Sequence, residues 1–425
     1  MKNNAKYAYW TIVILLLLAT AQSFMDRQIL SVSFLVIREE LDITDVQYGF
    51  INAAFLVSYA IMFTVAGVLI DRYGSRLGLA WSVGFWSFAS LLHAASNSAY
   101  QFMFYRFLLG LGEGGAFPGA AKAVSEYVPK KKQSLAMGIA IGGAAFGAVI
   151  APPLTVYMLM FVSWRAVFIF AGATGFIWLF YWLKYAKKLP AQEAGIRIPD
   201  DNAGKPAKKG KGLGIKKLLS DRTAYVFIGM RFLLDPVLYF YMFWIPRYLS
   251  DVHDLSLGLI GNLLWIPFLA LGVANIFGGW VSDLVFIKTN NVDFARKLIM
   301  GIGAVLTIPV FFIGWIPSYI PILVFITLAF FAHGIWITNY ITSISDIYGK
   351  HNTSSIVGFS GTAGAISAMV LNPLTGYVVS AYSYDPLWYY AGIMYPLVFI
   401  CFIIFIPKIK LKDSLKYEHE PMVSS

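Results

Sequence analysis

The sequence contains very little cysteine and few charged residues. Cys401 is the single cysteine among 425 residues, which excludes an intramolecular disulfide and a metal site built from several thiolates. Charged residues make up 13% of the chain, whereas soluble domains carry roughly 25%. With 58% hydrophobic residues, too few charges remain to cover a water-exposed surface. Soluble, disordered and coiled-coil proteins are therefore poor fits.

Long hydrophobic runs are abundant instead. Twelve stretches approach or exceed the roughly 18–20 residues with which a helix crosses a bilayer. They are 7–25, 46–70, 77–95, 100–127, 135–162 and 166–185, and then, after a polar gap, 224–248, 257–281, 298–316, 320–344, 354–380 and 386–406. Backbone amides in lipid must be satisfied within the chain. We therefore expect an all-α polytopic membrane protein with twelve transmembrane helices in two pseudo-symmetric sets of six.

The polar gap predicts the domain organisation. We expect residues 1–189 to form an N-terminal six-helix bundle and residues 221–410 a C-terminal one. Between them, residues 190–220 are rich in Lys, Gly, Pro and Ala and lack hydrophobic periodicity, which predicts a cytoplasmic linker. Residues 411–425 are expected to form a cytoplasmic tail.

The net charge of +11 reports orientation. If both termini lie in the cytoplasm, most of the 33 Lys and Arg residues fall in cytoplasmic segments, as the positive-inside rule requires. The alternative, a nucleic-acid-binding patch, lacks basic residues interleaved with aromatic ones on a soluble domain. We therefore expect a multi-pass protein of the inner (plasma) membrane that does not bind nucleic acid.

A short motif occurs once in each half of the chain. Gly67-Val-Leu-Ile-Asp71 ends the second hydrophobic run, and Gly279-Trp-Val-Ser-Asp283 ends the eighth. The repetition favours two parallel repeats, an architecture typical of rocking secondary transporters. We predict a gating role for six residues on the cytoplasmic face: Gly67, Asp71, Arg72, Gly74, Arg76 and Asp283. The alternative is a positive-inside loop that plays no part in gating.

Four ionisable residues at membrane depth are the strongest functional candidates, because such charges are costly in lipid. Arg106 and Glu113 are seven residues apart, two helical turns and about 10 Å along one face. They suit an anionic substrate and an exchangeable proton. Asp26 and Arg27 lie near the end of the first run; the carboxyl group can take a proton and the guanidinium can hold a carboxylate. The alternatives are an internal ion pair and an interfacial pair, respectively.

Other polar residues are weaker candidates. Tyr59 in the second run, and His333, Trp336 and Asn339 on one stripe of the tenth, are predicted to line a substrate site. A stripe of this kind also occurs in ordinary helix packing. Two pairs spaced i,i+4, Arg231 with Asp235 and Lys122 with Glu126, are either gates or structural pairs. The patterns Gly138-xxx-Gly142 and Gly143-xxx-Gly147 predict close helix packing.

Several motifs resemble a known family. Gly67-Val-Leu-Ile-Asp71-Arg72-Tyr-Gly74-Ser-Arg76 resembles the signature between the second and third helices of the major facilitator superfamily. Other stretches are similar to its anion:cation symporter branch, and within that branch to bacterial hexuronate transporters. They are Arg106-x6-Glu113-x4-Pro118-x3-Lys122-x2-Ser125-Glu126, Ile150-Ala-Pro-Pro-Leu154, Ser163-Trp164, Arg231-Phe-Leu-x-Asp235-Pro236, Trp244-Ile-Pro246, Trp265-x-Pro267, Phe331-Ala-His333 and Ser345-Asp346.

The resemblance implies proton-coupled uptake of sugar acids. In relatives that handle aldonates, the positions matching Asp26 and Glu113 are proton sites. Those matching Arg27 and Arg106 coordinate charge, and that matching Tyr59 lines the site. In hexuronate transporters the residue matching Asp26 can be uncharged, so this chain departs from them there.

The sequence therefore predicts a symporter of a small organic anion and protons, with a hexuronate or aldonate as its substrate and with alternating access as its mechanism. We expect a monomer in the lipid bilayer that needs no cofactor or metal and is driven by the proton gradient. It carries no phosphate-binding loop or nucleophile motif, so we do not expect an enzyme. Three alternatives remain: a symporter of another monocarboxylate or an aromatic acid, a drug/proton antiporter, and a non-transporting membrane sensor.

Overall fold

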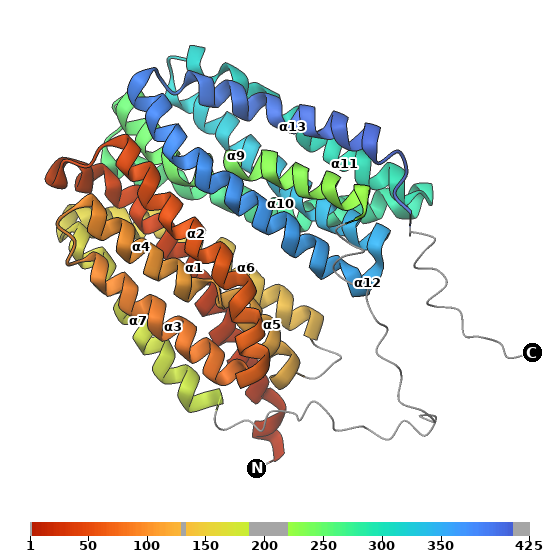
Figure 1. Ribbon diagram of the computed structural model, residues 1–425, viewed down its shortest axis with the longest axis horizontal. Coiled ribbons are helices and arrows are strands. Elements are labelled where there is room, and N and C mark those ends of the chain that lie inside the picture. The colour runs from red at the N-terminus through yellow and green to blue at the C-terminus, as the bar shows by residue number, and fades with distance from the viewer. Residues whose placement is uncertain (1, 129–132, 187–219, 411–425) are drawn as a thin grey trace, which may run out of the picture. The chain divides into compact units, whose positions relative to one another are not determined.

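The computed structural model describes residues 2–128, 133–186 and 220–410, and these are helical almost throughout. The first helices are α1 (Lys2–Leu41), α2 (Asp45–Tyr73), α3 (Ser75–His93), α4 (Ala99–Glu113), α5 (Ala116–Tyr127), α6 (Gln133–Phe161) and α7 (Trp164–Ala186). The later ones are α9 (Arg222–His253), α10 (Leu257–Thr289), α11 (Val292–Leu306), the 3-10 helix η2 (Ile308–Trp315), α12 (Tyr319–Ala381) and α13 (Asp385–Phe405) (Figure 1). These ranges contain no strand, and the predicted all-α fold class is confirmed.

Ten helical segments in the described ranges are long and apolar enough to cross a membrane. Seven of the twelve predicted runs correspond to single helices among them, and an eighth, 298–316, corresponds to α11 together with η2. α12 contains two more, Tyr319–Tyr348 and Ile356–Ala381. The two remaining predicted runs correspond to α3 and to the pair α4 and α5. This pair is interrupted at Gly114 and Gly115, so that neither piece alone spans a bilayer.

Packing divides the described residues into two compact units. Unit 1 takes its residues from 1–198, 239–269 and 368–383, and unit 2 from 199–238, 270–367 and 384–425. The units follow packing rather than the predicted halves 1–189 and 221–410, and those halves stay a prediction. The predicted linker and tail lie outside the described residues, apart from Ser220.

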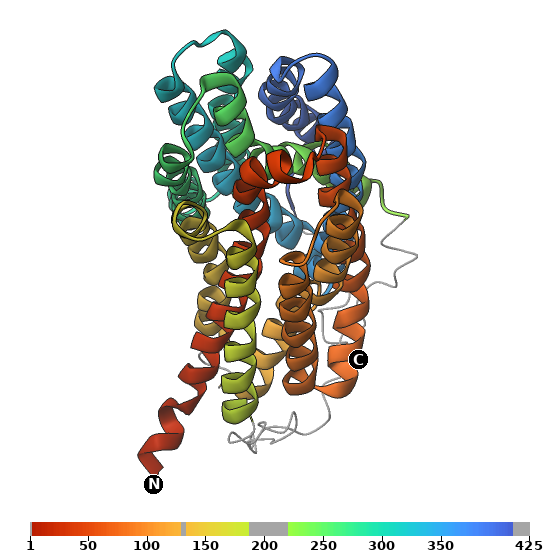
Figure 2. The same ribbon diagram turned by 90° about the vertical axis from the view of Figure 1, so that its left-hand side faces the viewer.

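In unit 1, helices pair along their length. α1 packs against α6, α2 against α4, and α3 against α7, and α7 also lies beside α1 (Figure 2). A Cβ atom at Gly143 or Gly147 of α6 would clash with the α1 backbone at Leu17 or Ala21. This glycine pair therefore permits the close approach that the sequence predicted. The other predicted pair, Gly138 and Gly142, has nothing within 4 Å of either Cβ position among the described residues.

A proline in α9 creates a second contact in unit 1, which we call the α9 seam. Pro246 has no N–H group, so the carbonyl of Met242, four residues earlier, lacks its helical donor. The Ser31 hydroxyl of α1 donates to this carbonyl at 3.1 Å and to that of Phe243 at 3.0 Å. The Tyr48 hydroxyl of α2 donates to Phe243 O at 2.8 Å. Side chains of α1 and α2 thus satisfy backbone groups of α9.

Ion pairs continue the seam toward the end of α9. Arg247 pairs with Asp45 of α2 and, at 2.9 Å, with Asp251. Asp251 also pairs with Arg38 of α1 at 2.6 Å. Both bases of the seam, Arg38 and Arg247, therefore have acidic partners.

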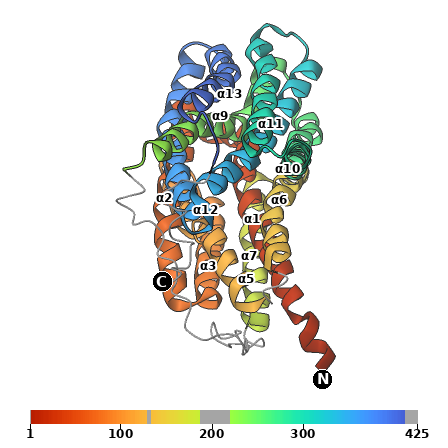
Figure 3. The ribbon, with the colours of Figure 1, turned by 90° about the vertical axis from the view of Figure 1, so that its right-hand side faces the viewer.

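Unit 2 contains α11, η2 and α13 packed together, with α11 and α13 adjacent in Figure 3. The Tyr340 hydroxyl of α12 donates to the Phe227 carbonyl of α9 at 2.9 Å. Ala274, Ile299 and Ile335 form a buried hydrophobic cluster within this unit. α12 is therefore held to α9 and to the α10–α11 packing by both polar and hydrophobic contacts.

The α9 seam predicts a difference between two serines of α1. Ser31→Ala removes the donor to Met242 O, and we expect the free energy of unfolding to fall by about 1–2 kcal/mol, because a buried carbonyl is left unpaired. Ser33 is also buried, but its hydroxyl has no hydrogen-bond partner in the described part of the chain. Ser33→Ala is the matched control and should leave stability unchanged or slightly higher. Thermal unfolding in detergent measures both, and an equal loss for the two variants would contradict the role of Ser31.

Candidate functional site

Five predicted site residues come together in unit 1. Asp26 and Arg27 are on α1, Tyr59 is on α2, and Arg106 and Glu113 are on α4. We call this group the charged cluster. Each of its two acids and two arginines exposes at most 4% of its surface. Two acids and two bases are thus withdrawn from solvent, which is costly unless they are paired or bind a ligand.

Arg27 and Glu113 form the main ion pair of the charged cluster. Arg27 Nε donates to Glu113 Oε2 at 2.9 Å. Ser23 Oγ, one turn earlier on α1, donates to the same oxygen at 2.8 Å. Oε1 of Glu113 has no hydrogen-bond partner in the ranges described. One carboxylate oxygen is therefore fixed, and the other is left with its bonding capacity unused.

Aromatic rings surround the Arg27 guanidinium. Its central carbon lies 4.6 Å from the ring centre of Phe24, 5.2 Å from that of Phe55 and 4.5 Å from that of Tyr59. Cation–π attraction is stronger where water is excluded, as here. Nη2 of Arg27 has no hydrogen-bond partner among the described residues. The rings hold the cation in place while one of its donors stays available.

Arg106 and Asp26 are less fully bonded. Arg106 Nη1 lies 3.5 Å from the backbone carbonyl of Asp26, and its guanidinium lies 5.4 Å from the Phe55 ring centre. Ser90 Oγ lies 3.5 Å from Asp26 Oδ1. Neither Nε of Arg106 nor Oδ2 of Asp26 has a hydrogen-bond partner in the described segments. At 3.5 Å both contacts are long for hydrogen bonds, so both residues retain capacity for a ligand.

The glycines of α4 serve close packing. A Cβ at Gly110 would clash with α2 at Ser58 and Phe55, and a Cβ at Gly112 would clash with Trp86 of α3. These two glycines therefore let α4 pack closely against α2 and α3.

The predicted residues of α12 lie in unit 2 and make contacts there. His333 Nδ1 shares a 2.5 Å hydrogen bond with the Tyr395 hydroxyl. Asn339 Nδ2 donates to the carbonyls of Gly278 and Ile335 at 3.1 and 2.9 Å. The ring centre of Trp336 lies 5.6 Å from that of Tyr395. Structural bonds thus occupy much of this stripe, and its predicted role in substrate binding stays a prediction.

The two i,i+4 pairs form as the spacing predicted. Arg231 Nε lies 2.6 Å from Asp235 Oδ1. Lys122 Nζ lies 4.0 Å from Glu126 Oε1. Oε2 of Glu126 also accepts hydrogen bonds from the backbone N–H and the hydroxyl of Ser75, at 3.2 and 2.6 Å. Glu126 therefore binds the first residue of α3 as well as its neighbour on α5.

In unit 1 the predicted gating motif forms the turn between α2 and α3. Gly74 has a φ of 81°, a backbone conformation that residues with a Cβ atom disfavour. Its N–H donates to Ile70 O at 2.8 Å. The position of a Cβ at Gly67 lies 4.0 Å from Pro118 of α5. Arg72 is exposed and Arg76 is half-buried. The side chain of Asp71 lies outside the described residues.

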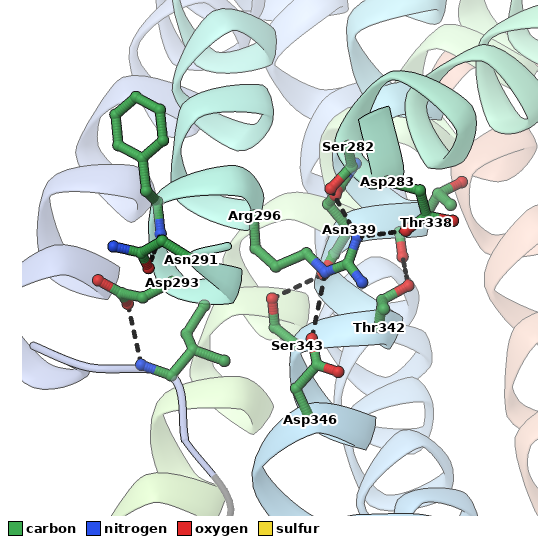
Figure 4. Close-up of polar contacts among 12 residues, drawn as sticks. Ser282, Asp283, Asn291, Asp293, Arg296, Thr338, Asn339, Thr342, Ser343 and Asp346 are labelled. Carbon is green, nitrogen blue, oxygen red and sulfur yellow. Dashed lines mark hydrogen bonds and ion pairs between the residues drawn. The ribbon is translucent and has the colours of Figure 1, made fainter. Parts of the chain in front are cut away.

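In unit 2 the matching motif contacts a base that was not among the predicted gating residues. Arg296 of α11 points at Ser282, Asp283 and Asp346 (Figure 4). Its ion pairs with the two acids are both 3.1 Å long. The available signal was Asp283 itself, because an acid repeated at a helix end predicts a basic partner nearby. The predicted gating residue Asp283 therefore takes part in an ion-pair network.

The described residues contain no group of three or more His, Cys, Asp or Glu side chains that could hold a metal ion. Helices of membrane-spanning length with a buried cluster of opposite charges define the protein as a polytopic membrane transporter. The chain matches the model of the Major Facilitator Superfamily over residues 16–371 and 257–422. It belongs to this family, whose members are membrane transporters and not enzymes.

Relatives and solved structures agree with this assignment. The hexuronate transporter of Escherichia coli (strain K12) is 28% identical over 387 residues, covering 89% of each chain. The galacturonate transporter of Dickeya chrysanthemi is 30% identical, covering 70% of this chain and 89% of that one. A crystal structure of a bacterial homolog to the human lysosomal transporter Spinster has a TM-score of 0.74 at 16% identity, covering 94% of this chain and 95% of that chain. The predicted family and its predicted sugar-acid relatives are confirmed.

The Arg27–Glu113 ion pair predicts a pattern of stabilities. Arg27→Leu leaves a buried carboxylate without its cation and should lower the free energy of unfolding by about 3 kcal/mol. Arg27→Leu combined with Glu113→Leu should recover most of this loss. Arg165→Leu is the control, because Arg165 pairs with Glu40 at a site where both side chains are more than a third exposed; it should cost less than about 1 kcal/mol. Thermal unfolding in detergent measures all three, and additive losses in the double variant would contradict the pairing.

Proposed function

We propose that this transporter carries an organic anion together with protons and takes up a sugar acid, a hexuronate or an aldonate, by alternating access. The observation that carries the proposal is the charged cluster, where two buried guanidinium groups each retain an unused donor atom. Two curated relatives, one at 28% and one at 30% identity, are named as transporters of hexuronate and of galacturonate. Both names support a substrate that carries a carboxylate.

Competition for Arg27 provides the coupling. In the structure, Glu113 occupies Arg27 Nε. A substrate carboxylate and an ionised Glu113 would place two negative charges on one guanidinium in a site with little solvent. A proton taken from outside by Glu113, together with Asp26, removes that competition and releases Arg27 to bind the substrate. Arg106, which has no side-chain carboxylate partner in the described segments, provides a second cation for the anion.

Proton release reverses these steps. When the cluster opens to the cytoplasm, Glu113 loses its proton and again attracts Arg27, so the substrate is displaced. Arg27 thus binds the substrate in one state of the cycle and Glu113 in the other. A ligand can shift a conformational equilibrium only if it binds the two states with different affinity, and this exchange of partners provides the difference. The cycle needs no cofactor and is driven by the proton gradient.

We further propose that the protein is a monomer of the inner membrane with both termini in the cytoplasm. The distribution of Lys and Arg supports this orientation. On this topology each unit has gating residues at its cytoplasmic end: Gly67, Asp71, Arg72, Gly74 and Arg76 in unit 1, and Asp283 in unit 2.

An aromatic carboxylic acid is a second candidate substrate. The three rings around the Arg27 guanidinium favour it, since an aromatic acid can place its carboxylate on the cation and its ring against Phe24, Phe55 or Tyr59. A drug/proton antiporter that exports cations is disfavoured, because two buried guanidinium groups repel such a substrate.

Uptake by Glu113→Gln tests the coupling. Gln resembles the protonated acid, so we expect exchange of internal and external glucuronate to continue while accumulation driven by a proton gradient is lost. Proteoliposomes with radiolabelled substrate allow both measurements on one preparation. Glu39→Gln, at an exposed residue of α1, is the control and should accumulate substrate normally. Normal accumulation by Glu113→Gln would refute the proton site.

Asp283→Asn tests the gate. It weakens one of the two ion pairs of Arg296. We expect the maximal uptake rate to fall several-fold, while the apparent substrate affinity stays within about twofold of wild type. The affinity is kept because a change that affects only a conformational step leaves the binding energy unchanged. Initial rates at varied substrate concentration separate the two quantities. Asp254→Asn, at an exposed residue after α9, serves as the control. A changed affinity with an unchanged maximal rate would argue against a gate.

A further inference from the structure

Asn52 of α2 is a buried polar residue with unused bonding capacity. It is 0% exposed, and its amide lies beside the Tyr48 hydroxyl. Among the described residues, neither its nitrogen nor its oxygen makes a hydrogen bond of good geometry. The nearby Tyr48 hydroxyl already donates its proton to Phe243 O at 2.8 Å. A buried amide without partners costs about 1–3 kcal/mol. A protein that keeps such an unfavourable group in its interior uses the group for something other than stability.

Two other buried asparagines of this chain show how an amide in a helix is normally satisfied. Asn372 Nδ2 donates to the carbonyl of Ala368, four residues earlier, at 2.8 Å. Asn339 Nδ2 makes the same bond to Ile335 O at 2.9 Å. Asn52 makes no such bond to its own helix, as judged from the described residues. Its nearest polar neighbour is the Tyr48 hydroxyl, four residues earlier on α2. The amide keeps its remaining bonding capacity for a partner that comes from outside α2.

The position of Asn52 places it next to the charged cluster. Phe55 and Tyr59 follow it by three and seven residues, which puts all three on one face of α2. The rings of Phe55 and Tyr59 lie against the Arg27 guanidinium, and that of Phe55 also lies 5.4 Å from Arg106. Asn52 thus lies one helical turn beyond the ring that both guanidinium groups contact.

We infer that Asn52 binds hydroxyl groups of the anion whose carboxylate is held by Arg27 and Arg106. A hydroxyl group both donates and accepts a hydrogen bond, and a primary amide offers one group of each kind. The ligand class is accordingly a polyhydroxylated carboxylate rather than a simple or aromatic acid. This inference rests on the proposed function and adds the residue that discriminates among its candidate substrates.

The discrimination follows from what each ligand does to the amide. A hydroxylated acid satisfies Asn52, whereas an acid without hydroxyl groups leaves it buried and unpaired. Sites built to bond a hydroxyl reject analogues that lack it far more strongly than apolar pockets reject a change in size. Arg27 and Arg106 supply affinity for either acid, and Asn52 supplies the difference between them.

Binding of two acids to wild-type and variant protein tests the inference. D-glucuronate and tetrahydropyran-2-carboxylate share a six-membered ring form and a carboxylate, but only the first carries ring hydroxyl groups. Calorimetry on the purified protein in detergent measures the affinity for each acid, and we expect the wild type to bind glucuronate more tightly. Asn52→Leu should weaken glucuronate binding at least about tenfold, with binding of the second acid within about twofold of wild type. Asn97→Leu, at an exposed residue before α4, is the control and should match the wild type.

A smaller substitution guards against misfolding. Asn52→Ser keeps a donor and an acceptor on a shorter side chain, and we expect an intermediate preference for glucuronate. Equal weakening of both acids, or an unchanged preference in both Asn52 variants, would overturn the inference and leave the proposed function standing. Failure of the wild-type protein to bind any sugar acid would instead overturn both.

Discussion

The charged cluster depends on one constraint, namely that an ionised side chain withdrawn from water must be paired. Arg27 and Glu113 satisfy each other across α1 and α4, and Ser23 and the surrounding rings complete their bonding. Gly110 of α4 lets that helix approach α2 at Ser58 and Phe55, and the Phe55 ring lies near both guanidinium groups of the cluster. The proposed transport cycle meets this constraint because Arg27 exchanges one anionic partner for another.

The fold was predictable because its signal is local. Hydrophobic length alone indicated the membrane helices, and the repeated motif at Asp71 and Asp283 indicated two related halves. The break of α4 at Gly114 was not predicted, since a glycine-rich run in lipid is compatible with either a continuous or an interrupted helix. The helix continuing through α12 past residue 348 also differs from the loop that a gap in hydrophobicity had suggested.

The members of the charged cluster were predictable from the sequence, but their bonds were not. Spacing placed Arg106 and Glu113 on one face, yet Glu113 pairs with Arg27 from another helix. Ser23, Arg296 and Asn52 were missed for the same physical reason. Serine, arginine and asparagine are common residues whose partners cannot be read from the sequence. Only the packing of the helices shows that Ser23 and Arg296 meet charged groups and that Asn52 keeps unused bonding capacity.

The α9 seam has a consequence for how this region tolerates change. Its acceptors are the backbone carbonyls of Met242 and Phe243, and a carbonyl is present whatever side chain the residue bears. The identity of these two residues is thus uncoupled from the bond. The position of Pro246 must be preserved instead. Moving the proline by one residue would leave a different carbonyl without its helical donor, and that carbonyl would be rotated by about 100° around the helix relative to Ser31.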